Sequence, residues 1–492
     1  MSEPFPVPRR ATRWIITAVA AAFMAASPKV AWAHAHLVRS APAAGARLDV
    51  SPTLIKLWYS EAAEATMTTI SITGPDGSRT SPGAVKVDPN NPLLLVATID
   101  VPLPAGKYTV SWRTVAKDDG HPSNGSFTFT VVGAAPGTVG TTSPAATGST
   151  RVTPSDSTRA MVPTTAPVHA MSVEAPSYVL ARWLDFVALV TVVGAAAFVL
   201  LVLPRVDAHN DEDRVGDFDA RATRRAATLG LAAGIAFLIA AVWRLYAEHA
   251  VVGGGVAMGA VLSSFWGNVW IAQFVIAVIV CVAFALARSS RRGGLAWLAV
   301  AIVAVVLAAT PAFSGHAIAA PGNKGISIAL DVIHVIAAGA WLGGLLTLTV
   351  AGVPAALSVG ESGDAVAGGD AGARGRISLV ARLVNAFSPL ALVFAGLVVA
   401  SGVIAAWMRI GSFGALFHST YGTVLLIKVG LVILVLAGGA FNWLRMRGAL
   451  AHHATGGSAV DTFRRSAWIE LTAGVLVIAV TAVLVATQPP VR

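Results

Sequence analysis

Two titratable side chains stand inside a long apolar stretch, residues 326–350. Asp331 and His334 are three residues apart, a spacing that places both on one face of an α-helix. At about 1.5 Å of rise per residue, a helix of this length crosses the roughly 30 Å hydrocarbon layer of a bilayer. A carboxylate and an imidazole are costly there unless they face the interior of a helix bundle, so the pair predicts a functional site. A structural hydrogen bond between helices is the alternative.

A third candidate ligand, His316, precedes this stretch by a short loop and follows the apolar run at residues 294–312. If the two spans are neighbours, His316, Asp331 and His334 form a cluster with the donor types that bind transition metals. A solvated histidine at a helix end is the alternative. Further along, Gly339 and Gly343 form a small-xxx-small pattern, which predicts close approach of a second helix.

The N-terminus has the layout of a secretory signal peptide over residues 1–33. It has a basic start, a short apolar core over residues 14–26, and an Ala31-Trp32-Ala33 cleavage motif. Cleavage after Ala33 makes His34 the first residue of the mature chain, and a second motif would leave His36 first instead. The domain that follows is therefore expected outside the cytoplasm.

A freed N-terminal histidine offers both its α-amino group and its ring nitrogen to one metal ion. Together with the Asp119 carboxylate and the His121 imidazole, His34 would form a nitrogen-rich tetragonal set that favours Cu(II). Met67 is the only methionine between residues 34 and 133, which argues against a thioether site for Cu(I). A turn that carries a solvated histidine is the alternative for Asp119 and His121.

The composition is that of an integral membrane protein. The 492 residues are 55% hydrophobic and only 12% charged, and the mean hydropathy is +0.70. The net charge of +10 does not indicate nucleic-acid binding, because most arginines fall in short loops between apolar spans. The single cysteine, Cys281, lies in an apolar run and excludes a disulfide within the chain or a thiolate cluster.

Residues 34–133 differ from the rest of the chain and predict an all-β sandwich. Strands are expected at residues 55–59, 69–73, 94–100, 108–115 and 126–132, with Gly, Pro and Asn turn signals between them. The last two strands have apolar residues at every second position. Residues 134–177 are rich in Thr, Ser, Ala, Pro and Gly, and we interpret them as a flexible linker.

Eight apolar spans follow in the membrane domain, residues 178–492. They are expected at residues 178–203, 226–247, 268–287, 294–312, 326–350, 386–408, 423–444 and 467–487. An extracytoplasmic sandwich makes the first span run inward, and the arginine-rich loops then fall inside. The basic residues expected in the outer loops and tail are Lys324, Arg409 and Arg492.

Polar residues within the spans gather in the outer half under this orientation. Arg182 with Asp185, and Arg244 with Glu248, have the spacing of pairs within one helix. We interpret both as structural ion pairs or as side chains that extend toward the interface.

The sandwich resembles the CopC family of copper-binding periplasmic proteins. The resemblance rests on His-Ala-His-Leu-Val-Arg-Ser-Ala-Pro at residues 34–42, Leu-Trp-Tyr-Ser-Glu at residues 57–61, Asp-Gly-His-Pro at residues 119–122 and Gly-Ser-Phe-Thr-Phe at residues 125–129. It implies a cupredoxin-like or Ig-like β-sandwich that holds Cu(II) through His34, Asp119 and His121, with Glu61 beside the ligands. The chain lacks the methionine-rich loop of some members.

The eight-span part resembles the CopD family of copper-resistance membrane proteins. The matching stretches are Ser-Gly-His-Ala at residues 314–317, residues 331–344, and residues 421–428 followed by Asn442. Fusion of the two domain types occurs in bacterial copper uptake and resistance proteins. The resemblance implies a second copper site at His316, Asp331 and His334.

These observations predict a multi-pass protein of the bacterial inner membrane, not an enzyme, whose outer domain captures Cu(II) and passes it to the bundle. Its expected partners are copper ions and the lipid bilayer, with no nucleic acid. A linker of about 45 residues spans roughly 35 to 40 Å, enough for such a transfer. Two alternatives remain open: a haem-bearing redox protein, and a copper buffer or sensor without translocation. No ATP-binding motif is visible in the sequence.

Overall fold

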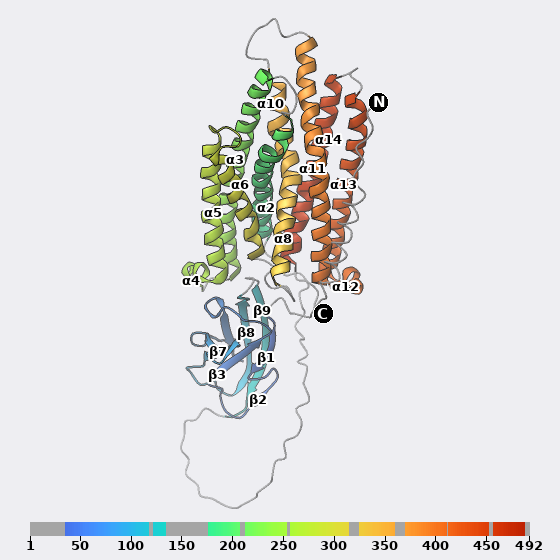
Figure 1. Cartoon of the computed structure of the whole chain (residues 1–492). Helices are drawn as coiled ribbons and strands as arrows, with labels where there is room; N and C mark the ends of the chain where they lie inside the picture. Colours follow the sequence, from blue (N-terminus) through green and yellow to red (C-terminus); the bar gives the residue numbers. More distant parts are fainter. Residues whose placement is uncertain are drawn as a thin grey trace, which may run out of the picture. The chain divides into compact units, whose positions relative to one another are not determined.

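The structure, a computed structural model, consists of two compact units, one mainly of β-strands, to which residues 252–264 are also assigned, and one of helices (Figure 1). It describes residues 35–117, 122–133, 176–206, 212–252, 256–313, 324–359, 370–410, 412–451 and 456–487. The predicted signal peptide, nearly all of the predicted linker, and the candidate ligands His34, Asp119, His121 and His316 lie outside these residues.

Two sheets build the first unit, as the sequence predicted. The first sheet has the order β1 (Leu37–Ala41), β3 (Leu54–Tyr59), β7 (Asn91–Thr98) and β6 (Lys86–Asp88). The second has the order β2 (Arg47–Leu48), β9 (Pro122–Val131), β8 (Gly106–Val115), β4 (Thr69–Thr73) and β5 (Arg79–Thr80). Strand β2 runs parallel to β9, and the other neighbouring strands in both sheets are antiparallel.

The alternation in β8 and β9 produces the core of this unit. Tyr108, Val110 and Trp112 are buried, and the partner strand buries Phe127 and Phe129. Tyr108 and Phe129 face each other in the register and stack with ring centroids 5.6 Å apart. Because successive side chains point to opposite faces of a strand, apolar residues at every second position give β8 and β9 one face each for the core.

Within the described residues the second unit has eight helices that are long and apolar enough to cross a membrane, as predicted. The long helices are α2 (Pro176–Ala197), α3 (Glu212–Val252), α5 (Phe265–Ala287), α6 (Leu295–Ala309), α8 (Lys324–Ala338), α11 (Asp370–Ile410), α13 (Thr420–Ala451) and α14 (Gly456–Ala486).

Shorter segments extend or join these helices. The fifth span continues from α8 through η5 (Gly339–Gly343), α9 (Gly344–Thr347), η6 (Leu348–Gly352) and α10 (Val353–Leu357). The first span continues from α2 through η2 (Phe198–Val202) and η3 (Leu203–Arg205), and η4 (Thr310–Phe313) continues α6. Helix α4 (Met258–Ser263) precedes α5, α12 (Phe413–His418) precedes α13, and η1 (Ala65–Met67) lies in the β unit.

Helix α2 lies at the centre of the bundle and packs against η5, α6 and α14 (Figure 1). The predicted glycine pattern is confirmed, and the helix that approaches it is α2. A Cβ atom on Gly343 would lie 1.9 Å from the carbonyl oxygen of Val190, and one on Gly194 would lie 2.0 Å from the carbonyl carbon of Gly343. Neither position has room for a side chain, so backbone meets backbone at this crossing.

We expect Gly343→Ala to destabilise the bundle by about 1 to 3 kcal/mol, because a methyl group here must push α2 away from η5. Gly396→Ala is the matched control, since a Cβ atom on Gly396 meets nothing within 4 Å. Thermal unfolding of the purified chain in detergent measures both. Equal unfolding temperatures for the two variants would show that the contact does not hold the bundle together.

Candidate functional site

One end of the β-sandwich joins the chain segments that flank the predicted Cu(II) ligands. His36 donates its backbone N–H to the Ser60 hydroxyl (3.0 Å), and Ser60 donates its backbone N–H to the His36 carbonyl (2.9 Å). From the other side, Lys117 donates its backbone N–H to the Ala62 carbonyl (2.9 Å). The segment at residues 60–64 therefore ties the start of β1 to the end of β8.

Two of the predicted Cu(II) ligands are close in sequence to residues that this segment contacts. His34 is two residues from His36, and Asp119 is two residues from Lys117. Glu61, which the CopC resemblance placed beside the ligands, belongs to that segment.

Burial sets the electrostatics of this end of the sandwich. It lowers the pKa of His36 below its ordinary value, which favours the neutral imidazole. It also raises the pKa of Tyr59, whose hydroxyl is buried without a hydrogen-bond partner among the described residues. The Tyr59 ring meets the Trp112 ring edge to face, with centroids 5.4 Å apart. Burial at this end of the sandwich therefore favours the uncharged forms of His36 and Tyr59.

In the helical unit, Asp331 of α8 pairs with Arg409 of α11. The Arg409 Nη2 donates to both carboxylate oxygens, at 3.2 Å to Oδ1 and 3.1 Å to Oδ2. The two side chains are 28% and 24% exposed. Arg409 was expected in an outer loop, and the structure places it instead in the last turn of α11. The carboxylate of the predicted membrane site thus has a cationic partner.

His334, one turn further along α8, also contacts α11. Its Nδ1 lies 3.0 Å from the Ser401 hydroxyl. Because that hydroxyl donates to the Leu397 carbonyl (2.6 Å), it accepts from the imidazole, and this hydrogen-bond network assigns the proton to Nδ1. The Val398 carbonyl is a further acceptor in the same turn. The Nε2 lone pair is then available to a metal ion, and α11 holds the ring.

Two side chains of α13 complete this cluster around Arg409. The buried Tyr421 forms a side-chain hydrogen bond with Arg409. Lys428 is close enough to interact electrostatically with both Arg409 and Asp331. We call Asp331, His334, Arg409, Tyr421 and Lys428 the α8/α11/α13 cluster. Apart from His334 it contains one carboxylate, two basic groups and one phenol, so cations outnumber anions.

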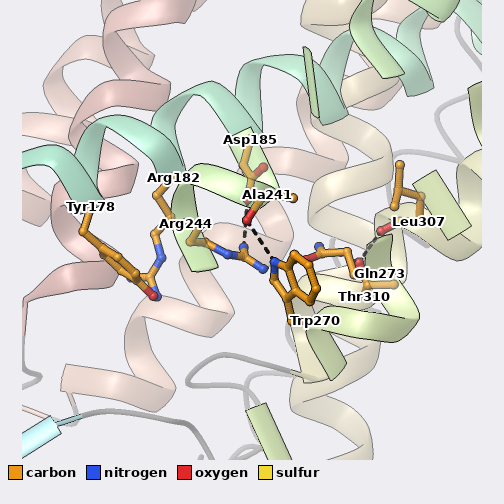
Figure 2. Close-up of polar contacts among 9 residues, drawn as sticks. All are labelled: Tyr178, Arg182, Asp185, Ala241, Arg244, Trp270, Gln273, Leu307 and Thr310. Atoms are coloured by element: carbon orange, nitrogen blue, oxygen red, sulfur yellow. Dashed lines mark hydrogen bonds and ion pairs between the residues drawn. The ribbon is translucent and has the colours of Figure 1, made fainter. Parts of the chain in front are cut away.

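A second polar network joins α2, α3, α5 and η4 (Figure 2). Arg244 of α3 donates from Nη1 to Asp185 Oδ2 (2.8 Å) and from Nη2 to Gln273 Oε1 (2.6 Å). Gln273 donates from Nε2 to the Thr310 hydroxyl (2.9 Å), which donates to the Leu307 carbonyl (2.8 Å). Asp185 and Arg244 are only 2% and 8% exposed. The network thus crosses four spans and is sealed from the surface.

Spacing along one helix did not reveal the pair between Arg244 and Asp185. The sequence suggested partners within a single helix, and Arg182 does interact electrostatically with Asp185. Arg244 in addition reaches across to α2. On α2 itself, Arg182 donates to the Tyr178 hydroxyl (3.1 Å) and lies over the Tyr178 ring, at 4.7 Å from its centroid. Figure 2 shows Trp270 beside the network, where it donates to the Ala241 carbonyl (2.9 Å).

Both polar groupings lie at the same end of the bundle. Asp185, Gln273 and Asp331 fall in the first half of their spans, whereas Arg244 and Arg409 fall in the second half of theirs. In Figure 1 this end carries α4 and α12, and α10 marks the opposite end. Asp331 and His334 therefore lie at a similar depth in the bundle to the polar groups of the other spans.

Among the described residues, no group of three or more His, Cys, Asp or Glu side chains has the geometry to hold a metal ion. His316 lies outside these residues, so the predicted set of His316, Asp331 and His334 stays a prediction. Arg409, Tyr421 and Lys428 are neighbours that sequence reasoning did not place in the site. The sequence feature that could have identified them is their shared depth in neighbouring spans. That depth follows from the alternating direction of successive helices.

The fold and these polar groupings describe a β-sandwich joined to a bundle of eight spanning helices. Three family models match it in order: the CopC domain at residues 37–132, the copper resistance protein D-like N-terminal domain at residues 172–326, and copper resistance protein D at residues 381–484. The chain belongs to the CopC and CopD families, with both domain types in one polypeptide.

Individual relatives agree with this assignment. The chain is 26% identical to the copper transport protein CutJ of Bacillus subtilis (strain 168) over 445 residues, which covers 88% of this chain and 71% of CutJ. It is 36% identical to protein YobA of Escherichia coli (strain K12) over 100 residues, which covers 20% of this chain and 80% of YobA. The crystal structure of CopC from Methylosinus trichosporium OB3b matches with 28% identity, 22% of this chain, 99% of that chain and a TM-score of 0.19.

We expect the buried network to hold the first four spans together. Asp185→Leu leaves the Arg244 guanidinium without its anionic partner, which should cost about 3 to 5 kcal/mol of stability. The double variant Asp185→Leu/Arg244→Met removes both charges and should recover part of that loss. Thermal unfolding in detergent measures the cycle.

Asp217→Asn is the control for this cycle, because Asp217 pairs with Arg221 at 2.9 Å but is 65% exposed. Loss of such an exposed pair should change stability by about 0.5 kcal/mol or less. A double variant that is less stable than Asp185→Leu alone would contradict the pairing argument.

Proposed function

We propose that this protein moves copper into or through the bacterial inner membrane. Its sandwich, outside the cytoplasm, captures Cu(II), and its helical bundle accepts the ion. One observation carries the proposal: a CopC domain precedes a CopD-type bundle whose imidazole, carboxylate and basic groups gather at one end. A domain that binds an ion and a bundle with polar groups in its outer half suit successive steps of one pathway.

Capture is the task of the sandwich. The α-amino group and imidazole of His34, the Asp119 carboxylate and the His121 imidazole supply the hard and intermediate donors that Cu(II) prefers. The contacts of residues 60–64 with the start of β1 and the end of β8 support the proposal, since they join a near neighbour of His34 to a near neighbour of Asp119. Glu61, in the same segment, would orient a ligand.

Acceptance is the task of the bundle. The His334 imidazole donates from Nδ1 to Ser401, and a metal-ligating histidine commonly donates its second ring nitrogen in this way. Asp331, three residues before it, offers a carboxylate on the same face of α8. His316 would supply the third donor. No resident cofactor enters this scheme, since copper is the cargo.

The first test concerns capture by the full-length chain. His34→Ala or His121→Ala should weaken Cu(II) binding by roughly 100-fold or more, because each removes a direct donor, and Glu61→Gln should weaken it by roughly 10-fold. Competition with a chelator measures affinity, and electron paramagnetic resonance reports the nitrogen donors. His169→Ala in the linker is the control and should bind like the parent. Unchanged nitrogen couplings in His34→Ala would refute the ligand set.

The second test concerns passage through the bundle. In a deletion strain, Asp331→Asn and His334→Ala should each lower copper movement several-fold while leaving Cu(II) capture unchanged, because each removes a donor of the inner site. Radiocopper or elemental analysis of cells measures the effect. Normal cellular copper in both variants, with loss of the phenotype in His34→Ala, would make the bundle an anchor and the protein a copper buffer or sensor.

A further inference from the structure

We infer that Arg409 is a tethered counter-ion for Asp331. The Arg409 guanidinium pairs with the Asp331 carboxylate when copper is absent and is displaced when copper binds. The inference rests on the proposed membrane site and adds a specificity-determining residue to it. Its basis is the juxtaposition of Asp331, His334, Arg409, Tyr421 and Lys428 on three helices.

The geometry shows that the carboxylate is already engaged. The Arg409 Nη2 lies 3.2 Å and 3.1 Å from the two Asp331 oxygens, so both oxygens already accept from one guanidinium nitrogen. His334 lies one turn away on the same helix, with its Nδ1 directed to Ser401. A metal ion that binds the Asp331 carboxylate therefore competes with the guanidinium for the same two oxygens.

Charge leads to the same conclusion. A copper ion beside Asp331 would meet Arg409 and Lys428, both within electrostatic range of that carboxylate. Like charges at such distances repel strongly in a medium of low dielectric constant. Copper and Arg409 are therefore alternative partners of Asp331. Exchange between them leaves the carboxylate paired in both states, as the membrane interior requires.

Arg409 has a second hydrogen-bond partner that remains available when its guanidinium is displaced from Asp331. Its side chain is also hydrogen-bonded to Tyr421 on α13, a contact that does not involve α8. Residue 402, next to Ser401, is a glycine, and a Cβ atom there would lie 3.3 Å from the His334 ring. The ring thus packs directly against the backbone of α11, and its position is set independently of the Arg409 side chain.

Exposure separates this pair from the buried one. Asp331 and Arg409 are 28% and 24% exposed, whereas Asp185 and Arg244 are 2% and 8% exposed. The first pair is therefore less enclosed by the bundle than the second. The exchange also favours copper over alkali and alkaline-earth ions, because only an ion that binds imidazole gains the His334 donor in return for Arg409.

The experiment measures copper affinity at the inner site alone. The parent is the full chain with His34→Ala and Asp119→Asn, which silence the sandwich, in nanodiscs. Cu(I) buffered with bathocuproine disulfonate and Cu(II) buffered with nitrilotriacetate are the probes. Arg409→Gln should lower the Kd by roughly tenfold or more, because it removes the competing charge. Arg409→Lys keeps the charge and should bind within about threefold of the parent.

Asp331→Asn separates this inference from the proposed function. If Asp331→Asn weakens binding but Arg409→Gln does not strengthen it, the counter-ion role is wrong and the inner site stands. If neither Asp331→Asn nor His334→Ala changes the Kd of the parent, the inner site itself is wrong and the counter-ion role with it. Addition of Asp331→Asn to Arg409→Gln should abolish the gain.

A second measurement needs no substitution at Arg409. Phenylglyoxal modifies free guanidinium groups, and mass spectrometry of the parent chain reports the rate at Arg409. Copper should raise this rate several-fold, since the side chain leaves the carboxylate. Arg221, whose partner is Asp217, is the internal control and should react at the same rate with and without copper. An unchanged or slower reaction at Arg409 would overturn the exchange.

Discussion

Charge inside an apolar bundle must be neutralised by a partner, and this constraint organises the helical unit. Two such pairs join different helices. Arg244 of α3 reaches Asp185 of α2, and Arg409 of α11 reaches Asp331 of α8. Each pair fixes the depth at which two spans meet, because a shift along either helix would leave a charge unpaired in a medium that does not solvate it.

Small residues provide the complementary constraint. Between α2 and η5 the backbones touch at Gly194 and Gly343, which removes side chains from the centre of the bundle and lets the other helices surround α2. In the part of the chain that the structure describes, the three π-helical segments lie in these two spans, in η2, η5 and η6. A π-turn adds a residue to a helix without ending it, and such turns are frequent at functional sites. Charge pairing thus sets the depth of the spans, and glycine contact sets the distance between the two central ones.

Much of the fold was predictable because its signals are local. Apolar residues at every second position identified β8 and β9, long apolar runs identified eight spans, and the spacing of Gly339 and Gly343 identified a close helix contact. The partners were not predictable in the same way. Arg409 lies 78 residues from Asp331, and Ser401 lies 67 residues from His334. No periodicity connects such positions, and helical spacing instead suggested partners for Asp185 and Arg244 within their own helices.

The two ion pairs differ in what they can do, although each joins an arginine to an aspartate. Around Asp185, Gln273 and Thr310 extend the hydrogen bonds of Arg244 to two further helices, so removal of one member disturbs all the rest. Around Asp331, the cluster has more cations than anions, a neutral imidazole beside the carboxylate, and partial exposure at the end of the bundle. A network that is enclosed by four spans resists exchange of its partners. A carboxylate that has more cationic partners than it can pair with, and a nitrogen donor nearby, is suited to the exchange of one bound cation for another.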